Sequence, residues 1–79
     1  MIRERIKETI QAILLDHKWI EPGEEVQEHH VYTADYGMDS IDLVEALMEL
    51  EKEYNVSIPD DVVERLDTVG KTIDFLIQQ

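Results

Sequence analysis

The sequence predicts an all-α protein, a small four-helix bundle with a short third helix and a long loop between the first two helices. Apolar residues recur at steps of three and four in several stretches, which is the spacing of one helix face. Helix-capping residues precede these stretches, and no pair of alternating segments indicates a β-hairpin. A chain of 79 residues has room for one core, so we expect a single domain over residues 1–79.

The first helix is expected between Ile2 and Asp16, because five aliphatic residues repeat along one face of that stretch. Pro22-Gly23 then marks a turn, and residues 17–37 show no long periodicity. A connection of this length usually has a function or local structure. We expect it to pack through its apolar side chains, which are Trp19, Ile20, Val26, Val31 and Tyr32.

The second helix is expected to begin at Asp39-Ser40 and to end near Asn55. Aspartate and serine are both good N-cap residues, and Asp42 adds a negative charge to the first turn, where the helix dipole favours it. An apolar stripe that we expect to face the core follows at steps of four, three and four: Leu43, Leu47, Leu50 and Tyr54.

Two shorter helices complete the predicted bundle. The third runs from Asp60 to about Leu66 and starts directly after Pro59. Asp67-Thr68 caps the fourth, in which Gly70 costs about 1 kcal/mol relative to alanine. The inner face of this last helix is expected to consist of Val69, Ile73, Leu76 and Ile77.

The charge of the chain excludes one large class of function. Nineteen acidic residues against seven basic ones give a net charge of −12, so the basic surface needed for nucleic-acid binding is missing. Residues 35–79 hold twelve of the acids and three of the bases, and such acidity steers positively charged partners to one surface. Without a signal peptide or an apolar run of spanning length, we expect no membrane span and a cytoplasmic location.

Residue types that support catalysis or metal binding are unfavourably arranged. The chain has no cysteine, and His17, His29 and His30 lack the i, i+4 spacing of a helical metal site, so we expect solvated loop histidines and no metal. The acidic segment 35–39 does not continue as an EF-hand, because Ser40 stands where that loop needs glycine. Ser40 also lacks the Gly-x-Ser-x-Gly setting of a hydrolase. We therefore expect a protein without its own active site.

The acids of the second helix allow two interpretations. Asp42, Glu45 and Glu49 share one face, and Val44 and Met48 lie beside them, off the main apolar stripe. Acids around exposed apolar side chains suit docking to a basic partner surface with an apolar centre. Alternatively, the two apolar residues belong to a wide core stripe and the acids simply face water. Periodicity alone favours this second interpretation.

Residues 35–41, Asp-Tyr-Gly-Met-Asp-Ser-Ile, resemble the Asp-Leu-Gly-x-Asp-Ser-Leu signature of acyl carrier proteins. The resemblance covers residues 35–77 closely and residues 2–16 as a generic amphipathic first helix. The Asp-Ser core is short, but the later segments follow at the intervals that the family has. These segments are residues 42–48, 58–61, 67–69 and 73–75.

The resemblance implies both a fold and a cofactor. The fold is the four-helix bundle of acyl carrier proteins, and the serine of the signature carries 4′-phosphopantetheine donated by coenzyme A. The thiol of this arm holds acyl groups as thioesters, so a cysteine-free chain performs thiol chemistry with a borrowed sulfur. By resemblance, Ser40 is the attachment site and Asp39 belongs to the motif that the phosphopantetheinyl transferase reads.

Two further sets of residues follow from the resemblance. A surface for docking acyl-loading and synthase enzymes, which have basic docking surfaces, is expected to consist of Ile41, Asp42, Val44, Glu45, Met48 and Glu49. With this match, docking becomes the favoured interpretation of the second helix. The core, which in this family also serves as an acyl pocket, is expected to consist of Leu43, Leu47, Leu50, Val63, Leu66 and Ile73. We expect a monomer.

The chain also departs from the family pattern. Tyr36 replaces the usual leucine, His29-His30 is unusual, and residues 17–33 match poorly. These departures put a housekeeping fatty-acid carrier in doubt and leave a specialised acyl or polyketide-type pathway open. Two alternatives also remain, an aminoacyl or peptidyl carrier and an unmodified acidic helical adaptor.

Overall fold

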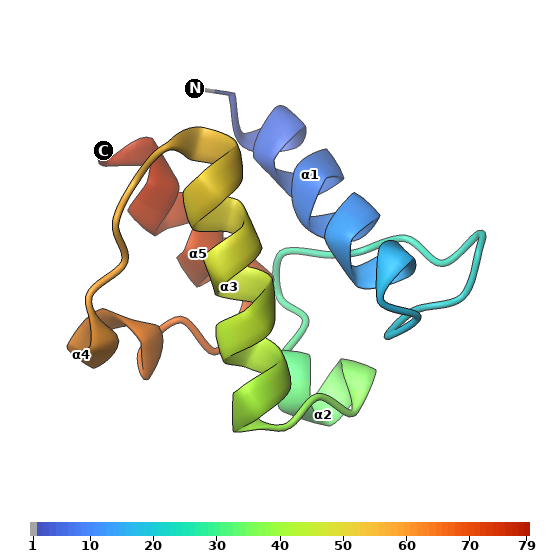
Figure 1. Cartoon of the computed structure of the whole chain (residues 1–79). Helices are drawn as coiled ribbons and strands as arrows, with labels where there is room; N and C mark the ends of the chain where they lie inside the picture. Colours follow the sequence, from blue (N-terminus) through green and yellow to red (C-terminus); the bar gives the residue numbers. More distant parts are fainter. Residues whose placement is uncertain (1) are drawn as a thin grey trace.

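The computed structural model describes residues 2–79 and confirms the all-α fold (Figure 1). The extended pairing in this part of the chain is one isolated antiparallel bridge, between Val31 and Thr68. Helices α1 and α3 lie side by side, α5 packs against α1, and both ends of the chain lie at the same end of the molecule. The helices are α1 (Arg3–Asp16), α2 (Tyr32–Tyr36), α3 (Ser40–Tyr54), α4 (Asp60–Val63) and α5 (Val69–Ile77).

Two predictions about the elements need correction. Helix α2 lies in the segment expected to be loop, and at five residues it is too short to produce a periodicity. The Asp35 carboxylate accepts the Val31 N–H (2.7 Å) at its start, and Gly37 ends it with φ 64°. Helix α4 ends at Val63 instead of Leu66, because the chain continues in tighter i→i−3 turns there.

The core lies where α1, α3 and α5 meet, and it includes side chains of the long connection. The expected stripe of α3 is buried at Leu47 and Leu50 and partly buried at Leu43 and Tyr54. The prediction is wrong for Ile77, which is 37% exposed near the end of α5. The other buried residues are Ile6, Ile10, Leu14, Ile20, Val26, Tyr32, Met38, Ala46, Ile58, Leu66, Val69, Thr72, Ile73 and Leu76.

The long connection is held by the first turn of α5. A helix leaves its first backbone N–H groups without partners inside the helix. Here the Gly70 N–H donates to the Glu28 carbonyl (2.8 Å) and the Val69 N–H to the His30 carbonyl (3.2 Å), while the Thr68 hydroxyl accepts the N–H of Lys71 (3.1 Å). The connection therefore completes the cap of α5.

Gly70 permits this contact. A Cβ atom at this position would lie 3.0 Å from the Glu28 carbonyl oxygen, closer than side chains normally approach backbone. The sequence identifies Gly70 only as a residue that weakens a helix. In the structure Gly70 leaves room for the backbone of the connection, which passes directly over it.

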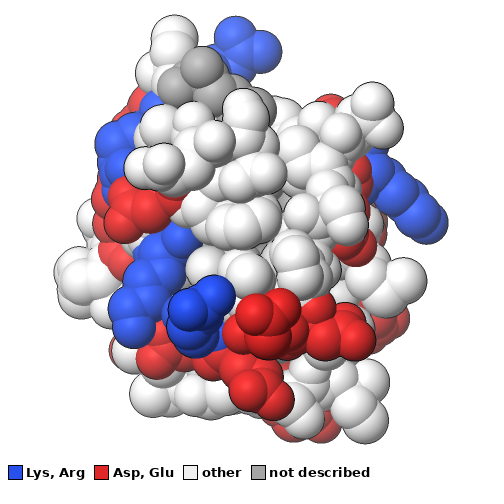
Figure 2. Space-filling model, turned by 90° about the vertical axis from the view of Figure 1, so that its left-hand side faces the viewer, with Lys and Arg blue, Asp and Glu red and all other residues white. Residues whose placement is uncertain are grey.

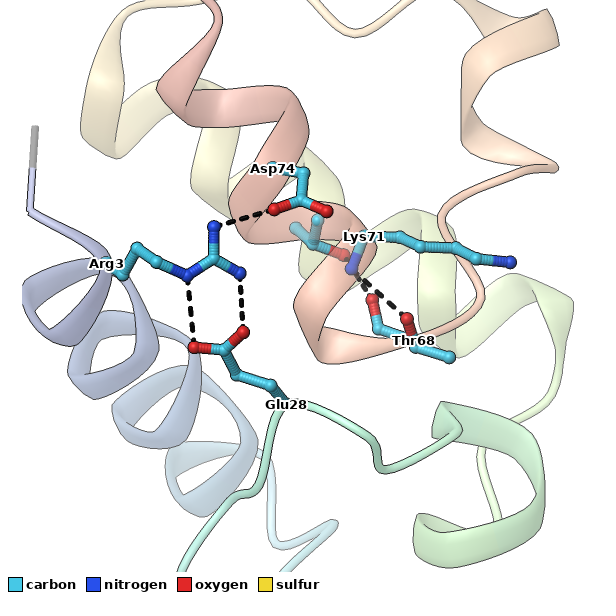
Figure 3. A network of polar contacts seen from close by, with 6 residues as sticks. Arg3, Glu28, Thr68, Lys71 and Asp74 are labelled. Carbon is cyan, nitrogen blue, oxygen red and sulfur yellow. Dashed lines mark hydrogen bonds and ion pairs between the residues drawn. The ribbon is translucent and has the colours of Figure 1, made fainter.

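An ion-pair network that starts from α1 also holds the connection against α5 (Figure 3). The Arg3 guanidinium donates to both oxygens of Glu28 (3.2 and 2.5 Å) and to Asp74 of α5 (2.6 Å). Hydrogen bonds from Arg3 lower the pKa of the Glu28 carboxyl. Arg3 thus links α1, the connection and α5 at the point where Glu28 crosses Gly70.

Replacing Gly70 with alanine tests this packing. By helix propensity alone, the change stabilises the protein by about 1 kcal/mol. We expect the free energy of unfolding to fall instead, by about 1 kcal/mol or more, because the added methyl group presses on the Glu28 carbonyl. Urea unfolding measures the change.

A double-mutant cycle provides the control. Arg3→Gln frees the Glu28 side chain, so the connection can shift and the Gly70→Ala penalty should shrink in that background. If the effects of Arg3→Gln and Gly70→Ala on the free energy of unfolding are strictly additive, the proposed packing is contradicted.

Candidate functional site

Ser40 is the first residue of α3, and its side chain is exposed. The preceding Asp39 is the N-cap residue: its carboxylate accepts the Asp42 N–H (2.8 Å), and the Asp42 carboxylate accepts the Asp39 N–H (3.1 Å). This reciprocal capping box leaves the serine hydroxyl out of the cap. Within residues 2–79 the Ser40 hydroxyl has no hydrogen-bond partner, so it is available for modification.

The start of α3 is polar but open. The capping box satisfies the N–H groups of Asp39 and Asp42, and the two between them, of Ser40 and Ile41, find no acceptor in residues 2–79. Free N–H groups and the positive end of the helix dipole favour a phosphate at this position. The residues present therefore fit a phosphodiester on the Ser40 oxygen.

The backbone before Ser40 is anchored in the core by Met38, which is only 2% exposed. The Met38 N–H donates to the carbonyl of Tyr32 (3.2 Å), after Gly37 has reversed the chain. Tyr32 in turn is buried and hydrogen-bonds the Thr72 hydroxyl of α5 (2.8 Å). No role for Met38 could be predicted from the sequence, because its position in the signature accepts any residue.

Two departures from the family pattern contact each other beside α2. The Tyr36 hydroxyl lies 2.6 Å from Nδ1 of His30, and the Gln27 N–H also donates to that nitrogen (3.2 Å). Because Nδ1 accepts from a backbone N–H, Tyr36 is the donor in its own contact. Burial raises the pKa of Tyr36 to about 12. His30 is therefore partly buried and bonded, whereas His29 is exposed as expected.

The proposed docking face of α3 exposes its apolar residues. Ile41 is 73% exposed, Val44 42% and Met48 51%, so the interpretation of the last two as core residues is wrong. Glu45 is exposed, and Asp42, though part of the capping box, remains partly exposed. The face thus combines apolar and acidic side chains at the surface.

Glu49 differs from the other acids of this face. Its carboxylate contacts Nε2 of His17, and the His17 ring stacks on Trp19 with the centroids 4.5 Å apart. The expectation of a solvated His17 is therefore wrong, since its side chain is only 29% exposed. The start of the long connection, just after α1, thus reaches the edge of the proposed docking face.

A cavity of about 710 Å³ opens beside Ser40, between α3 and α4. Of the predicted acyl-pocket residues, Leu43, Leu47 and Val63 line it. The remaining lining residues are Thr33, Ser40, Val44, Met48, Glu51, Ile58, Asp60, Glu64 and Asp67.

The other three predicted pocket residues, Leu50, Leu66 and Ile73, are buried but do not line this cavity. The predicted set therefore divides into cavity residues and core residues.

Among residues 2–79, His, Asp and Glu side chains form no group of three that could hold a metal ion. The same part of the chain contains no helix that is long and apolar enough to cross a membrane.

A family model described as "Phosphopantetheine attachment site" matches residues 4–76. The chain belongs to this family. It is a carrier protein, its cofactor is covalently attached 4′-phosphopantetheine, and it has no catalytic site of its own. Carrier proteins of this kind interact with phosphopantetheinyl transferases and with synthases. The resemblance to a carrier is confirmed, and the unmodified adaptor loses its support.

Met38 provides a test of how the carrier holds its site. Met38→Ala removes a side chain that is 2% exposed, so we expect it to lower the free energy of unfolding by about 2–5 kcal/mol. Met48→Ala is the matched control, because that side chain is 51% exposed and should change stability by less than about 0.5 kcal/mol. Urea unfolding measures both variants, and a similar loss of unfolding free energy in the two would contradict the anchoring role of Met38.

Proposed function

We propose that residues 1–79 form a single, monomeric acyl carrier domain with its phosphopantetheine arm on Ser40. In this proposal the arm holds acyl intermediates as thioesters and carries them between enzymes of a fatty-acid or a specialised acyl or polyketide-type pathway in the cytoplasm. One observation carries the proposal: the exposed Ser40 follows the capping Asp39, begins α3 and lines the cavity.

The loading reaction fits the surroundings of Ser40. Its oxygen forms an ester with the phosphorus that bears the pantetheine group of coenzyme A, its proton passes to the transferase or solvent, and the adenosine bisphosphate leaves. The N–H groups of Ser40 and Ile41 then face the new phosphodiester, which supports its binding there. We assign Asp39 to recognition by the transferase, because its negative charge does not favour a phosphate next to it.

The cavity supports acyl cargo. Ser40 stands at its edge, and apolar side chains of α3 and α4, including Leu47 and Val63, line its walls. Burying an apolar chain there removes it from water, at about 0.8 kcal/mol for each methylene group. This supports an acyl cargo with an alkyl chain.

The face of α3 that begins at Ile41 supports docking to basic enzymes. Its exposed apolar residues supply the centre of a contact, and Glu45 and Glu49 supply negative charge around it. Lys52 is the one basic residue of α3, and it lies in the last turn. A positively charged partner is therefore drawn toward the end that bears Ser40.

Ser40→Ala tests the attachment site. We expect the variant to gain no phosphopantetheinyl group when incubated with coenzyme A and a broad-specificity transferase, while its helical circular dichroism stays unchanged, because Asp39 keeps the cap. Ser57→Ala removes the other serine of the chain, also exposed, and should load fully. Intact mass followed by fragmentation reads the result; loading of Ser40→Ala would overturn the assignment.

Charge reversal tests the docking face. We expect Glu45→Lys with Glu49→Lys to weaken binding to the transferase about tenfold at low ionic strength, and by less at high ionic strength, because salt screens the attraction.

Glu4→Lys with Glu8→Lys is the matched control for this change. It has the same spacing and the same change in charge, but lies on α1, and should leave the affinity near that of the wild type. Equal weakening by both pairs would indicate a net-charge effect and remove the special role of the α3 face.

A further inference from the structure

The charged residues of the cavity are all of one sign. Besides apolar groups and two hydroxyl residues, its lining includes four carboxylates and no lysine, arginine or histidine. The carboxylates come from both sides of the opening, with Glu51 on α3 and the others on or after α4. The four acidic residues are Glu51, Asp60, Glu64 and Asp67.

The structure distinguishes these carboxylates by their partners. Asp67 pairs with Lys71 (2.9 Å), and this hydrogen bond lowers the pKa of the Asp67 carboxyl. Glu51 accepts the Ile58 N–H (2.6 Å), a neutral donor, so its negative charge is not neutralised. Asp60 and Glu64 form no ion pair within residues 2–79. Three carboxylates at the cavity therefore have no cationic partner within residues 2–79.

Two basic side chains belong to a neighbouring groove. Arg65 and Lys71 line a shallow depression that shares Glu64 and Asp67 with the cavity, and neither of these two bases lines the cavity. Figure 2 shows the side of the molecule on which α4 lies in Figure 1, where acidic side chains form a group and basic side chains adjoin it on one flank. Acidic and basic side chains thus adjoin each other on this side, while the lining of the cavity itself contains acids and no base.

From the acidic lining, which contains no base, we infer that the cavity admits acyl groups whose far end is uncharged and rejects acyl groups that end in a carboxylate. The inference rests on the proposed function, because it takes the cargo to be held on Ser40. A carboxylate that enters an apolar cavity loses water and finds no cation to pair with. The like charges of Glu51, Asp60 and Glu64 add repulsion at the opening. A plain alkyl chain has no charge to desolvate and is not repelled by the carboxylates.

Three matched cargoes test the selectivity. The broad-specificity transferase loads the carrier with an octanoyl group, with the suberyl group of the same carbon number, which ends in a carboxylate, or with the methyl ester of that suberyl group. Methyl NMR shifts of Leu43, Leu47 and Val63 then report how far each chain enters the cavity.

At pH 7 we expect octanoyl and methyl-suberyl groups to shift these methyl signals. The suberyl group should enter with an equilibrium constant about tenfold smaller. Equal shifts from suberyl and methyl-suberyl groups would overturn the inference.

Variants that remove charge test whether the cavity carboxylates cause the selectivity. Asp60→Asn with Glu64→Gln removes two carboxylates from the cavity. The equilibrium constants with which the suberyl and methyl-suberyl chains enter the cavity should therefore become more similar. The matched control is Asp61→Asn with Glu53→Gln, which makes the same change in net charge at side chains that do not line the cavity. It should leave the two equilibrium constants as far apart as in the wild type. If both pairs of substitutions bring the two constants equally closer, the cavity carboxylates are not responsible and the inference fails.

The two proposals fail in different ways. If the transferase does not load Ser40, the carrier assignment itself is wrong. If Ser40 is loaded but the octanoyl group leaves the methyl signals unchanged, the carrier assignment stands and the inference about the cavity is overturned.

Discussion

The contact of the Glu28 backbone with Gly70 determines where the long connection runs, and the position of Ser40 follows from it. The connection passes over the first turn of α5, and two of its carbonyls accept N–H groups of that turn. From there the chain reaches Tyr32, whose N–H bonds the Asp67 carbonyl and whose hydroxyl contacts Thr72. Tyr32 then receives the N–H of Met38, two residues before Ser40. Each of these steps ties the approach to the site to α5.

The two capped helices of this protein treat their N-terminal N–H groups differently. At α5 the carbonyls of the connection and the hydroxyl of Thr68 accept the N–H groups, so that end of the helix is closed. At α3 the capping box accepts the outer two N–H groups and leaves those of Ser40 and Ile41 open to solvent. Since unpartnered N–H groups attract anions, the open helix start is the one suited to a phosphodiester. The same physical constraint thus distinguishes a structural helix end from a functional one.

The residues of helix α3 lie in three environments. Leu47 and Leu50 are buried in the core, while Ile41 and Met48 are exposed on the face that we propose for docking. Leu43 borders the cavity next to α4, and so do Leu47 and Met48. Helix α4 is a single short turn with no fully buried residue, so it adds little packing on that side. A helix supported from one side only leaves room for a cavity on the other.

The sequence by itself determined the all-α fold and the starts of α3 and α5, because caps and helical periodicity are local properties of the chain. Ser40 was indicated by the resemblance of residues 35–41 to the acyl-carrier signature. The sequence also indicated that the proposed docking face is acidic, since acids at steps of three and four must share a side of the helix. It missed α2, because one turn of helix produces no periodicity and depends on the Asp35 carboxylate and Gly37. It could not distinguish surface from core for Val44 and Met48, because both interpretations fit the same spacing.

Only the tertiary structure decided which of the predicted pocket residues border the cavity and which fill the core. Leu43, Leu47 and Val63 share the first environment, and Leu50 and Ile73 share the second, although all five are apolar residues of helical stripes. The same holds for Gly70, Arg3 and His17, whose partners lie 25 or more residues away in the sequence. Burial and pairing depend on how the helices and the connection meet in space, and a local pattern contains no information about contacts over such separations.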